Sequence, residues 1–319
     1  MLTRKIRLAL GARSLGRWPT PLEWVGPLGD ALGLACLWLK REDRSAESGG
    51  NKVRGLEFLF ADAEPGTVYV TVGGTGSTHC LATAVHAAAL GCRAVVAQFP
   101  QADTAASRAV GAACARAAAA TIRARTRVGL PLAVVRAWRV GRRLGRARWI
   151  PGGGAHPCAV AGHLLAGLEL AAQLPDPPDA ILTPLGSGGT AAGLLLAVHA
   201  LGWPTHVIAA RVAPAVVANR WRVARLARGA VGLLAAHGVV VPRPAGSPLV
   251  LDCAGPGYGR PSAAGEGARA RAAAEGLRLD PTYGAKAFAA LPALAARGCR
   301  RVVFWHTFAF PPGDAERAS

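Results

Sequence analysis

The sequence predicts an α/β fold with mostly parallel sheets. Three observations carry this prediction: the chain is 51% hydrophobic, short β-type runs alternate with alanine-rich segments, and several of these runs lead directly into glycine. Parallel strands need a crossover between them, and the crossover is usually a helix, so alternating strands and helices indicate parallel pairing. Charged residues make up only 17% of the 319 residues, which leaves enough apolar sequence for a substantial core.

The predicted strands and helices are spread along the whole chain. The expected strands are Thr67–Val72, Ala94–Phe99, Ala180–Pro184, His206–Val212 and Arg301–His306, and helices are expected at Val160–Leu174 and Ala191–Ala200. Three consecutive glycines at 152–154 interrupt this pattern and predict a hinge between two lobes.

The formal net charge of +19 raises the question of a nucleic-acid partner, because Lys and Arg can neutralise phosphates. Only four of the 37 basic residues are lysines, and Arg and Ala are abundant throughout, which is typical of a compositional bias across the gene. The basic run from Arg136 to Arg148 is interpreted as a solvated helix face, and no nucleic-acid motif accompanies it. We therefore expect no nucleic-acid partner, and an anion- or nucleic-acid-binding protein is the weaker alternative.

The seven cysteines are odd in number, scattered and never spaced as CxxC, which indicates reduced, mostly packed thiols and no metal site. The apolar stretch Leu8–Ala12 is too short for the core of a signal peptide. No uncharged apolar run free of Gly and Pro is long enough to span a bilayer. These features predict a cytoplasmic protein with no membrane partner.

Lys52 is the first candidate for chemistry. It follows Gly50-Asn51 and opens a helical pattern that includes Leu56 and Leu59. Near a helix N-terminus, backbone N–H groups and the positive end of the dipole disfavour protonation of a lysine amine. Such a lysine can act as a nucleophile, although an isolated lysine in a first helical turn is more often structural.

A glycine-rich turn joins the strand at Ala180–Pro184 to the next helix. Its residues are Gly186, Ser187, Gly188, Gly189 and Thr190. Backbone N–H groups and two hydroxyls can converge here on an anion at the helix N-terminus, as in a phosphate site. The turn lacks the lysine of GxxxxGK[ST] and the spacing of GxGxxG, so it does not demand a nucleotide.

A second turn of this kind, Gly73 to His79, presents Ser77, Thr78 and His79 at another predicted helix N-terminus. These side chains can hold a substrate carboxylate, or they can cap the helix by satisfying free N–H groups. The segment taken by itself favours neither.

These motifs occur in a fixed order through nearly the whole chain. They are Pro19–Leu22, Lys40–Asp43, Gly50–Lys52, Ser77 with His79, Gly153–Pro157, Gly186–Thr190, Tyr258–Gly259 and Asp280–Tyr283. In this order they resemble the fold-type II enzymes that use pyridoxal 5′-phosphate (PLP), specifically the D-cysteine desulfhydrase and 1-aminocyclopropane-1-carboxylate (ACC) deaminase family.

The resemblance implies a two-lobed α/β fold of the tryptophan synthase β-subunit type, with parallel-rich sheets flanked by helices. Residues 1–53 and 161–319 would form the large PLP-binding lobe, and residues 54–160 the small lobe. It also implies a homodimer.

The resemblance further assigns roles to the candidate residues. Lys52 would form a Schiff base with PLP and move protons, with Asn51, Thr78 and the turn from Gly186 to Thr190 around the cofactor. The substrate carboxylate would lie against Ser77, Thr78 and His79. Tyr258 and Tyr283 would stand over the substrate and, with Lys52 and Ser77, form the catalytic set.

The implied activity is that of a PLP-dependent lyase or deaminase acting on a small amino acid. A D-cysteine desulfhydrase-like α,β-elimination to pyruvate, sulfide and ammonia is the first expectation, because Thr307 after His306 is similar to the desulfhydrases, whereas leucine there is typical of ACC deaminases. An ACC deaminase and a non-catalytic PLP-binding homologue are the alternatives.

The chain departs from the family pattern at three places. Thr78 replaces an asparagine beside the cofactor ring, and Gly284 replaces a residue able to partner the pyridine nitrogen. Phe308–Phe310 stands where the family has two glycines, and the tail from Pro311 to Ser319 is expected to be loose coil that lacks or alters the final helix.

Overall fold

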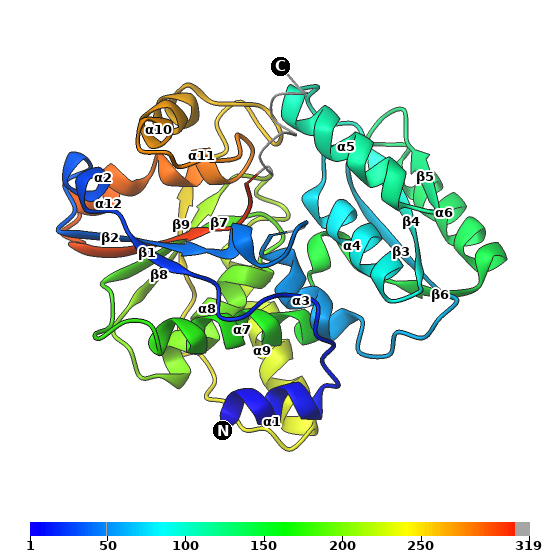
Figure 1. Ribbon diagram of the computed structural model, residues 1–319, viewed down its shortest axis with the longest axis horizontal. Helices are drawn as coiled ribbons and strands as arrows, with labels where there is room; N and C mark the ends of the chain where they lie inside the picture. Colours follow the sequence, from blue (N-terminus) through cyan, green and yellow to red (C-terminus); the bar gives the residue numbers. More distant parts are fainter. Residues whose placement is uncertain (49, 310–319) are drawn as a thin grey trace.

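The structure is a computed structural model that describes residues 1–48 and 50–309. Two sheets, each covered by helices, form two lobes (Figure 1). The strands are β1 (Leu22–Trp24), β2 (Cys36–Arg41), β3 (Thr67–Gly74), β4 (Arg93–Phe99), β5 (Ala120–Arg123), β6 (Arg146–Trp149), β7 (Ala180–Leu185), β8 (His206–Arg211), β9 (Leu249–Asp252) and β10 (Arg301–His306).

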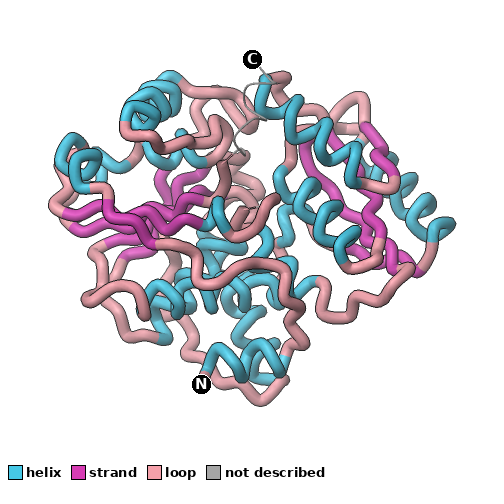
Figure 2. The backbone as a smooth tube through the Cα atoms, viewed as in Figure 1, coloured by secondary structure: helices cyan, strands magenta, loops and turns pink. Residues whose placement is uncertain are grey.

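Helices precede, separate and follow these strands, as the tube drawing shows (Figure 2). They are α1 (Leu2–Ala9), α2 (Gly26–Ala31), α3 (Lys52–Leu59), α4 (Thr78–Ala89), α5 (Ala105–Ala117), α6 (Leu130–Leu144), α7 (Pro157–Ala171), α8 (Gly189–Ala200), α9 (Arg220–Ala236), α10 (Ala263–Ala274), α11 (Gly284–Phe288) and α12 (Leu291–Ala295), with short 3₁₀ turns at Glu42–Arg44 (η1) and Gly152–Gly154 (η2).

The larger sheet has the strand order β1-β2-β10-β7-β8-β9. Every pairing is parallel except β1 with β2. The last strand, β10, lies in the middle, where Val303 pairs with Trp38 on one side and Ile181 on the other. This central strand is apolar on both faces, and Phe304 and Trp305 are fully buried, as expected for a parallel strand covered by helices on both sides.

The smaller sheet, β5-β4-β3-β6, is parallel throughout. Successive side chains of a strand point to opposite faces, so Val68 and Val70 pack with Ala137 of α6, whereas Tyr69 packs with Ala84 of α4. The sheet is therefore covered on both sides, and its strands end on the side that faces the larger lobe (Figure 1).

The predicted α/β class with mostly parallel strands is confirmed. All five predicted strands are present, and the helix predicted at Val160–Leu174 is α7, which begins at Pro157 and ends at Ala171. The interpretation of Arg136–Arg148 as one helix face is wrong at its end: α6 stops at Leu144, and the last two arginines lie in β6.

The glycines at 152–154 form the turn η2, which links the small sheet to α7. The lobe boundaries at 53/54 and 160/161 stay a prediction. Within residues 1–48 and 50–309, no helix has both the length and the apolarity that a membrane crossing requires.

Candidate active site

A cavity of about 390 Å³ lies where strands of both sheets end. Its walls include residues at or just after the carboxyl ends of β3, β4, β7 and β8, which is where parallel α/β sheets usually bind ligands. A smaller hollow runs along the turn at 186–190. The two share Lys52, Thr78, Gly186, Ser187 and Tyr283 as lining residues, so they form one continuous site.

Lys52 is held in this site by the turn that precedes it. Gly50 has a φ of 54°, and a Cβ there would overlap the carbonyl oxygen of Thr307. Asn51 donates its backbone N–H to that same oxygen at 2.9 Å, and its Nδ2 donates to Thr190 Oγ1 at 2.8 Å. The start of α3 is thereby fixed to the end of β10 and to the start of α8.

The Lys52 amine has a lowered pKa and no hydrogen-bond acceptor among the described residues, as a nucleophile requires. Burial lowers the pKa of Lys52 from 10.5 to about 8, which raises the fraction of unprotonated, nucleophilic amine at neutral pH. Among the described residues, none accepts a hydrogen bond from its Nζ. The sequence pointed to the helix N-terminus as the cause of this effect; burial is the cause in the folded protein.

The turn at 186–190 has the geometry of an anion cradle. Gly188 has a φ of 96°, which favours glycine, and it caps the N-terminus of α8. No described residue accepts a hydrogen bond from the backbone N–H groups of residues 187–190. The Ser187 hydroxyl donates to the Gly153 carbonyl at 3.1 Å, so it braces the cradle, and the cradle offers its backbone N–H groups to a ligand.

The start of α4 forms the opposite wall. Ser77 caps this helix, accepting the Cys80 N–H at 3.3 Å, and Thr78 lines both the cavity and the hollow. No described residue accepts a hydrogen bond from the N–H groups of Thr78 and His79. These free donors at a helix N-terminus suit a carboxylate.

The His79 ring has a defined tautomer. Thr71 Oγ1 donates to the Ile150 carbonyl at 2.9 Å, so it accepts from His79 Nε2 at 2.9 Å, and Nδ1 is an acceptor without a partner among the described residues. Burial, and then the nearby Lys52 charge, lower the pKa of His79 to about 3. The ring is therefore neutral. The contribution of His79 to carboxylate binding is limited to its backbone N–H.

Tyr258 and Tyr283 meet in the wall of the cavity. Their hydroxyl oxygens are 2.8 Å apart and their rings pack edge to face. Burial raises the pKa of both phenols, so both are protonated at neutral pH. The Asp280 carboxylate accepts the N–H groups of Tyr283 and Gly284, both at 2.7 Å, and this fixes the turn that carries Tyr283.

The structure explains the departure at Phe308 but not the one at Gly284. A Cβ at Gly284 would come within 2.9 Å of Asp280 Oδ2, which is the end of a side chain that can move aside, and Gly284 has no positive φ, so the turn does not require glycine. Phe308 is 7% exposed, lines the hollow and packs with Cys80 and Val110 of the small lobe, so it joins the lobes. Phe310 and the predicted loose tail lie outside the described residues.

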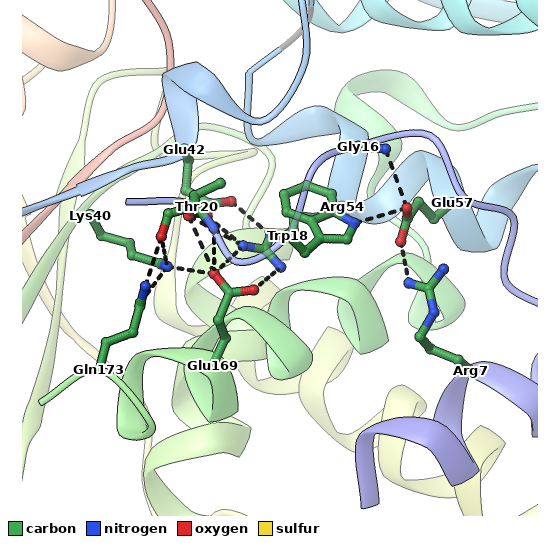
Figure 3. Close-up of polar contacts among 10 residues, drawn as sticks. All are labelled: Arg7, Gly16, Trp18, Thr20, Lys40, Glu42, Arg54, Glu57, Glu169 and Gln173. Carbon is green, nitrogen blue, oxygen red and sulfur yellow. Dashed lines mark hydrogen bonds and ion pairs between the residues drawn. The ribbon is translucent and has the colours of Figure 1, made fainter. Parts of the chain in front are cut away.

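Sequence reasoning missed a buried charge network beside α3 (Figure 3). Arg54, two residues after Lys52, donates to Glu42 at 2.7 and 3.0 Å and to Glu169 with two bonds of 2.8 Å. Lys40 donates to Glu169, and to Gln173 at 2.7 Å. Lys40–Asp43 stood out in the sequence as a motif, but nothing there indicated its distant partner on α7.

The sequence also gave no sign of three further cavity residues, Phe99, Arg127 and Arg222. In a chain with 37 basic residues, individual arginines do not stand out. Arg127 enters the site from the loop between β5 and α6, and Arg222 from the first turn of α9.

The comparisons with known proteins agree with this geometry. The model of the family described as "Pyridoxal-phosphate dependent enzyme" matches residues 13–307. A D-cysteine desulfhydrase from Salmonella schwarzengrund (strain CVM19633) is 33% identical over 303 residues, which cover 91% of this chain and 88% of the relative.

Solved structures show the same fold. An ACC deaminase homologue matches with a TM-score of 0.82 at 27% identity, covering 95% of this chain and 94% of that one. Threonine deaminase isoform 2 from Solanum lycopersicum matches in fold alone, with a TM-score of 0.69 at 16% identity, covering 100% of this chain and 88% of that one. The predicted two-lobed, fold-type II architecture is confirmed, and the chain belongs to the family of pyridoxal-phosphate-dependent enzymes.

Proposed function

We propose that the protein is a PLP-dependent lyase that removes the β-substituent of a small amino acid, in the manner of a D-cysteine desulfhydrase. With D-cysteine the overall change would be D-cysteine plus water to pyruvate, hydrogen sulfide and ammonia. The observation that carries the proposal is the 33% identity to D-cysteine desulfhydrase across 91% of the chain. The free Lys52 amine, which lines the same site as the anion cradle and the tyrosine pair, supports it.

The residues present fit the cofactor. The free N–H groups of residues 187–190 suit its phosphate, and Lys52, which has a depressed pKa and no described partner, suits its carbonyl group. Asn51 orients Thr190 beside the cradle, and Thr78 lines the wall shared by the cavity and the hollow. When bound, PLP supplies an electron sink for the carbanion that forms at the substrate Cα.

The protein side chains would then bind the substrate and move protons. The free N–H groups of Thr78 and His79, with the Ser77 hydroxyl, would hold the α-carboxylate at the start of α4. The Lys52 amine would take the proton from Cα, because burial lowers its pKa towards the working pH. The Tyr258–Tyr283 pair has one hydroxyl hydrogen left over to donate to the leaving group.

Two alternatives keep specific support. The ACC deaminase homologue matches the fold with a TM-score of 0.82, which favours ring opening of a cyclopropane amino acid as the second candidate activity. Gly284 offers no side chain to the pyridine nitrogen, which favours a non-catalytic PLP-binding homologue as the third.

Absorbance of the purified protein with added PLP tests the proposal. We expect a band near ~420 nm that sodium borohydride fixes covalently at Lys52 and that Lys52→Ala does not form. Pyruvate and sulfide released from D-cysteine would select the desulfhydrase, and 2-oxobutyrate from ACC would select the deaminase. A Lys52-dependent band without any keto acid would select the non-catalytic homologue, and no band at saturating PLP would contradict all three.

We also propose a cytoplasmic homodimer. The support is the resemblance to the desulfhydrase family and the seven free cysteines, which suit a reducing compartment. Light scattering of the purified protein should give twice the chain mass of 32.6 kDa, and a value of 32.6 kDa would contradict the dimer.

A further inference from the structure

The lining of the 390 Å³ cavity contains more positively charged side chains than the proposed reaction uses. Its lining includes Lys52, Arg127 and Arg222, and no Asp or Glu. Lys52 is assigned to the cofactor, and the start of α4 provides donors for the substrate α-carboxylate. The two arginines are left without a role in binding D-cysteine, whose thiol is mostly uncharged at neutral pH, with a pKa of roughly 8.5.

Arg222 is placed to face the cavity. It lies in the first turn of α9, where a cation opposes the helix dipole, and no described carboxylate forms an ion pair with it. Its Nε donates to the Ser187 carbonyl at 3.0 Å, which fixes the guanidinium beside the cradle. The residue lines the large cavity and not the hollow along the 186–190 turn, so its remaining N–H groups are available to a ligand in that cavity.

Arg127 comes from the other lobe, in the loop between β5 and α6. Its guanidinium carbon is 5.9 Å from the centre of the Phe99 ring, and its charge acts on the neighbouring Tyr258 phenol. No described carboxylate forms an ion pair with it. The two lobes therefore each contribute one unpaired arginine to the cavity.

The walls around the arginines are mostly apolar. Leu130 is half-buried, whereas Val216 and Val217, which precede α9, are 84% and 40% exposed, and Arg127 is also exposed, so this part of the cavity opens to solvent. A charge-assisted hydrogen bond is worth more than a neutral one, and at a site open to solvent its strength depends on the salt concentration. A second anionic group on the substrate would meet two cations and no competing carboxylate.

We propose that Arg127 and Arg222 form a second anion subsite, and that the preferred substrates are α-amino acids whose side chain carries its own carboxylate, sulfonate or phosphate. This inference rests on the proposed PLP-dependent lyase function and changes its preferred substrate from D-cysteine to an amino acid with an anionic side chain. A neutral side chain such as that of cysteine or serine leaves both arginines without an anion.

The test compares matched ligands on the PLP-loaded, full-length protein. Loading PLP first occupies the cradle at 186–190, so a phosphate probe reports on the arginines. Dissociation constants for serine and O-phosphoserine, each as D and L enantiomers, are measured from the change in cofactor absorbance. We expect the better O-phosphoserine enantiomer to bind at least about tenfold more tightly than the matching serine, in keeping with a hydrogen bond to a charged group, with the preference falling as salt rises.

Arg127→Gln should reduce this preference by about tenfold, because it removes one cation and breaks no hydrogen bond to another described residue. Arg125→Gln is the matched control, since Arg125 is an exposed arginine of the same loop that does not line the cavity, and it should leave the preference unchanged. Arg222→Lys keeps the charge but loses the Nε contact to Ser187, and should retain part of the preference.

The outcomes separate the two proposals. A missing cofactor band would contradict the PLP-dependent function itself. A normal Lys52-dependent band with equal affinity for serine and O-phosphoserine, or an equal loss in Arg125→Gln and Arg127→Gln, would overturn the anion subsite alone. Aspartate, tested in parallel, distinguishes a subsite that accepts any anion from one that requires phosphate.

Discussion

The hydroxyls of Tyr258 and Tyr283 share one hydrogen bond, and this limits what each can do. At 2.8 Å one hydroxyl donates and the other accepts, so one of the two hydroxyl hydrogens is left to point elsewhere. The raised pKa of both phenols keeps them protonated at neutral pH. The pair can therefore act as a proton donor, but not as a phenolate base.

We assign the leftover hydroxyl hydrogen to Tyr283, which lines both the cavity and the hollow. Tyr283→Phe should therefore lower kcat about 100-fold or more, because it removes a general acid that contributes on the order of 10²–10⁴. The affinity for PLP should change by less than about threefold, since the cradle and Lys52 are intact. The measurement is steady-state kinetics of keto-acid formation together with a PLP titration.

Tyr69→Phe is the matched control for this change. The Tyr69 hydroxyl is buried without a hydrogen-bond partner among the described residues and does not line the candidate active site. Its removal should leave kcat within about twofold. Equal losses in the two variants would show that Tyr283 has no chemical role.

The position of α3 determines where the Lys52 amine lies, because Lys52 is the first residue of this helix. One end is fixed by the contacts of Gly50 and Asn51 with Thr307, and the network of Arg54 with Glu42 and Glu169 fixes its side (Figure 3). The charges of Arg54 and Lys40 balance those of Glu42 and Glu169. Arg54 also stacks on Trp18, with its guanidinium carbon 3.6 Å from the ring centre.

Glu42→Gln should lower the free energy of unfolding by about 3–5 kcal/mol, because it leaves buried cations with one carboxylate too few. It should also weaken PLP binding. Arg54, which would lose one of its two carboxylate partners, lies on the helix that carries Lys52. Chemical denaturation and PLP titration measure the two effects.

Glu64→Gln offers a comparison at an exposed ion pair. Glu64 and Arg146 lie 3.2 Å apart with side chains that are 68% and 61% exposed, so this change should cost less than about 1 kcal/mol and leave PLP binding as it is. If Glu42→Gln cost no more than Glu64→Gln, the network would not be what holds α3.

At the scale of the whole molecule, three buried histidines make stability depend on pH. Burial is the main cause that lowers the pKa of His79 and His163 to about 3 and that of His306 to about 4. In the unfolded chain their pKa is about 6.5. Their contribution to stability is therefore full above pH ~6.5 and is lost as the pH falls towards 4, because only the unfolded chain then takes up these protons.

His163→Gln tests this dependence in the large lobe. Below pH ~6.5 each such histidine contributes up to about 1.4 kcal/mol per pH unit to the loss of stability, so the variant should show a shallower decline between pH 6 and 5. The measurement is the free energy of unfolding at both pH values. Parallel curves for the variant and the parent would mean that His163 is protonated in the folded protein.

The sequence by itself determined the fold class and the main chemical groups of the site. Alternating strands and helices are set by local spacing, and β3, β7 and β10 lie within two residues of their predicted bounds. Lys52, Thr78 and the 186–190 turn were identifiable because glycine-rich turns before helices have a local cause, the free N–H groups of a helix start.

Only the tertiary structure decided how these groups are used. The short strands β1, β5, β6 and β9 have three or four residues each, too few to show a period, and form because neighbouring strands pair with them. Burial, a property of the whole fold, lowers the pKa of Lys52 and makes His79 neutral. Arg127 and Arg222 line one cavity only because two separate lobes bring them together. A local sequence pattern cannot predict a contact between residues so far apart in the chain.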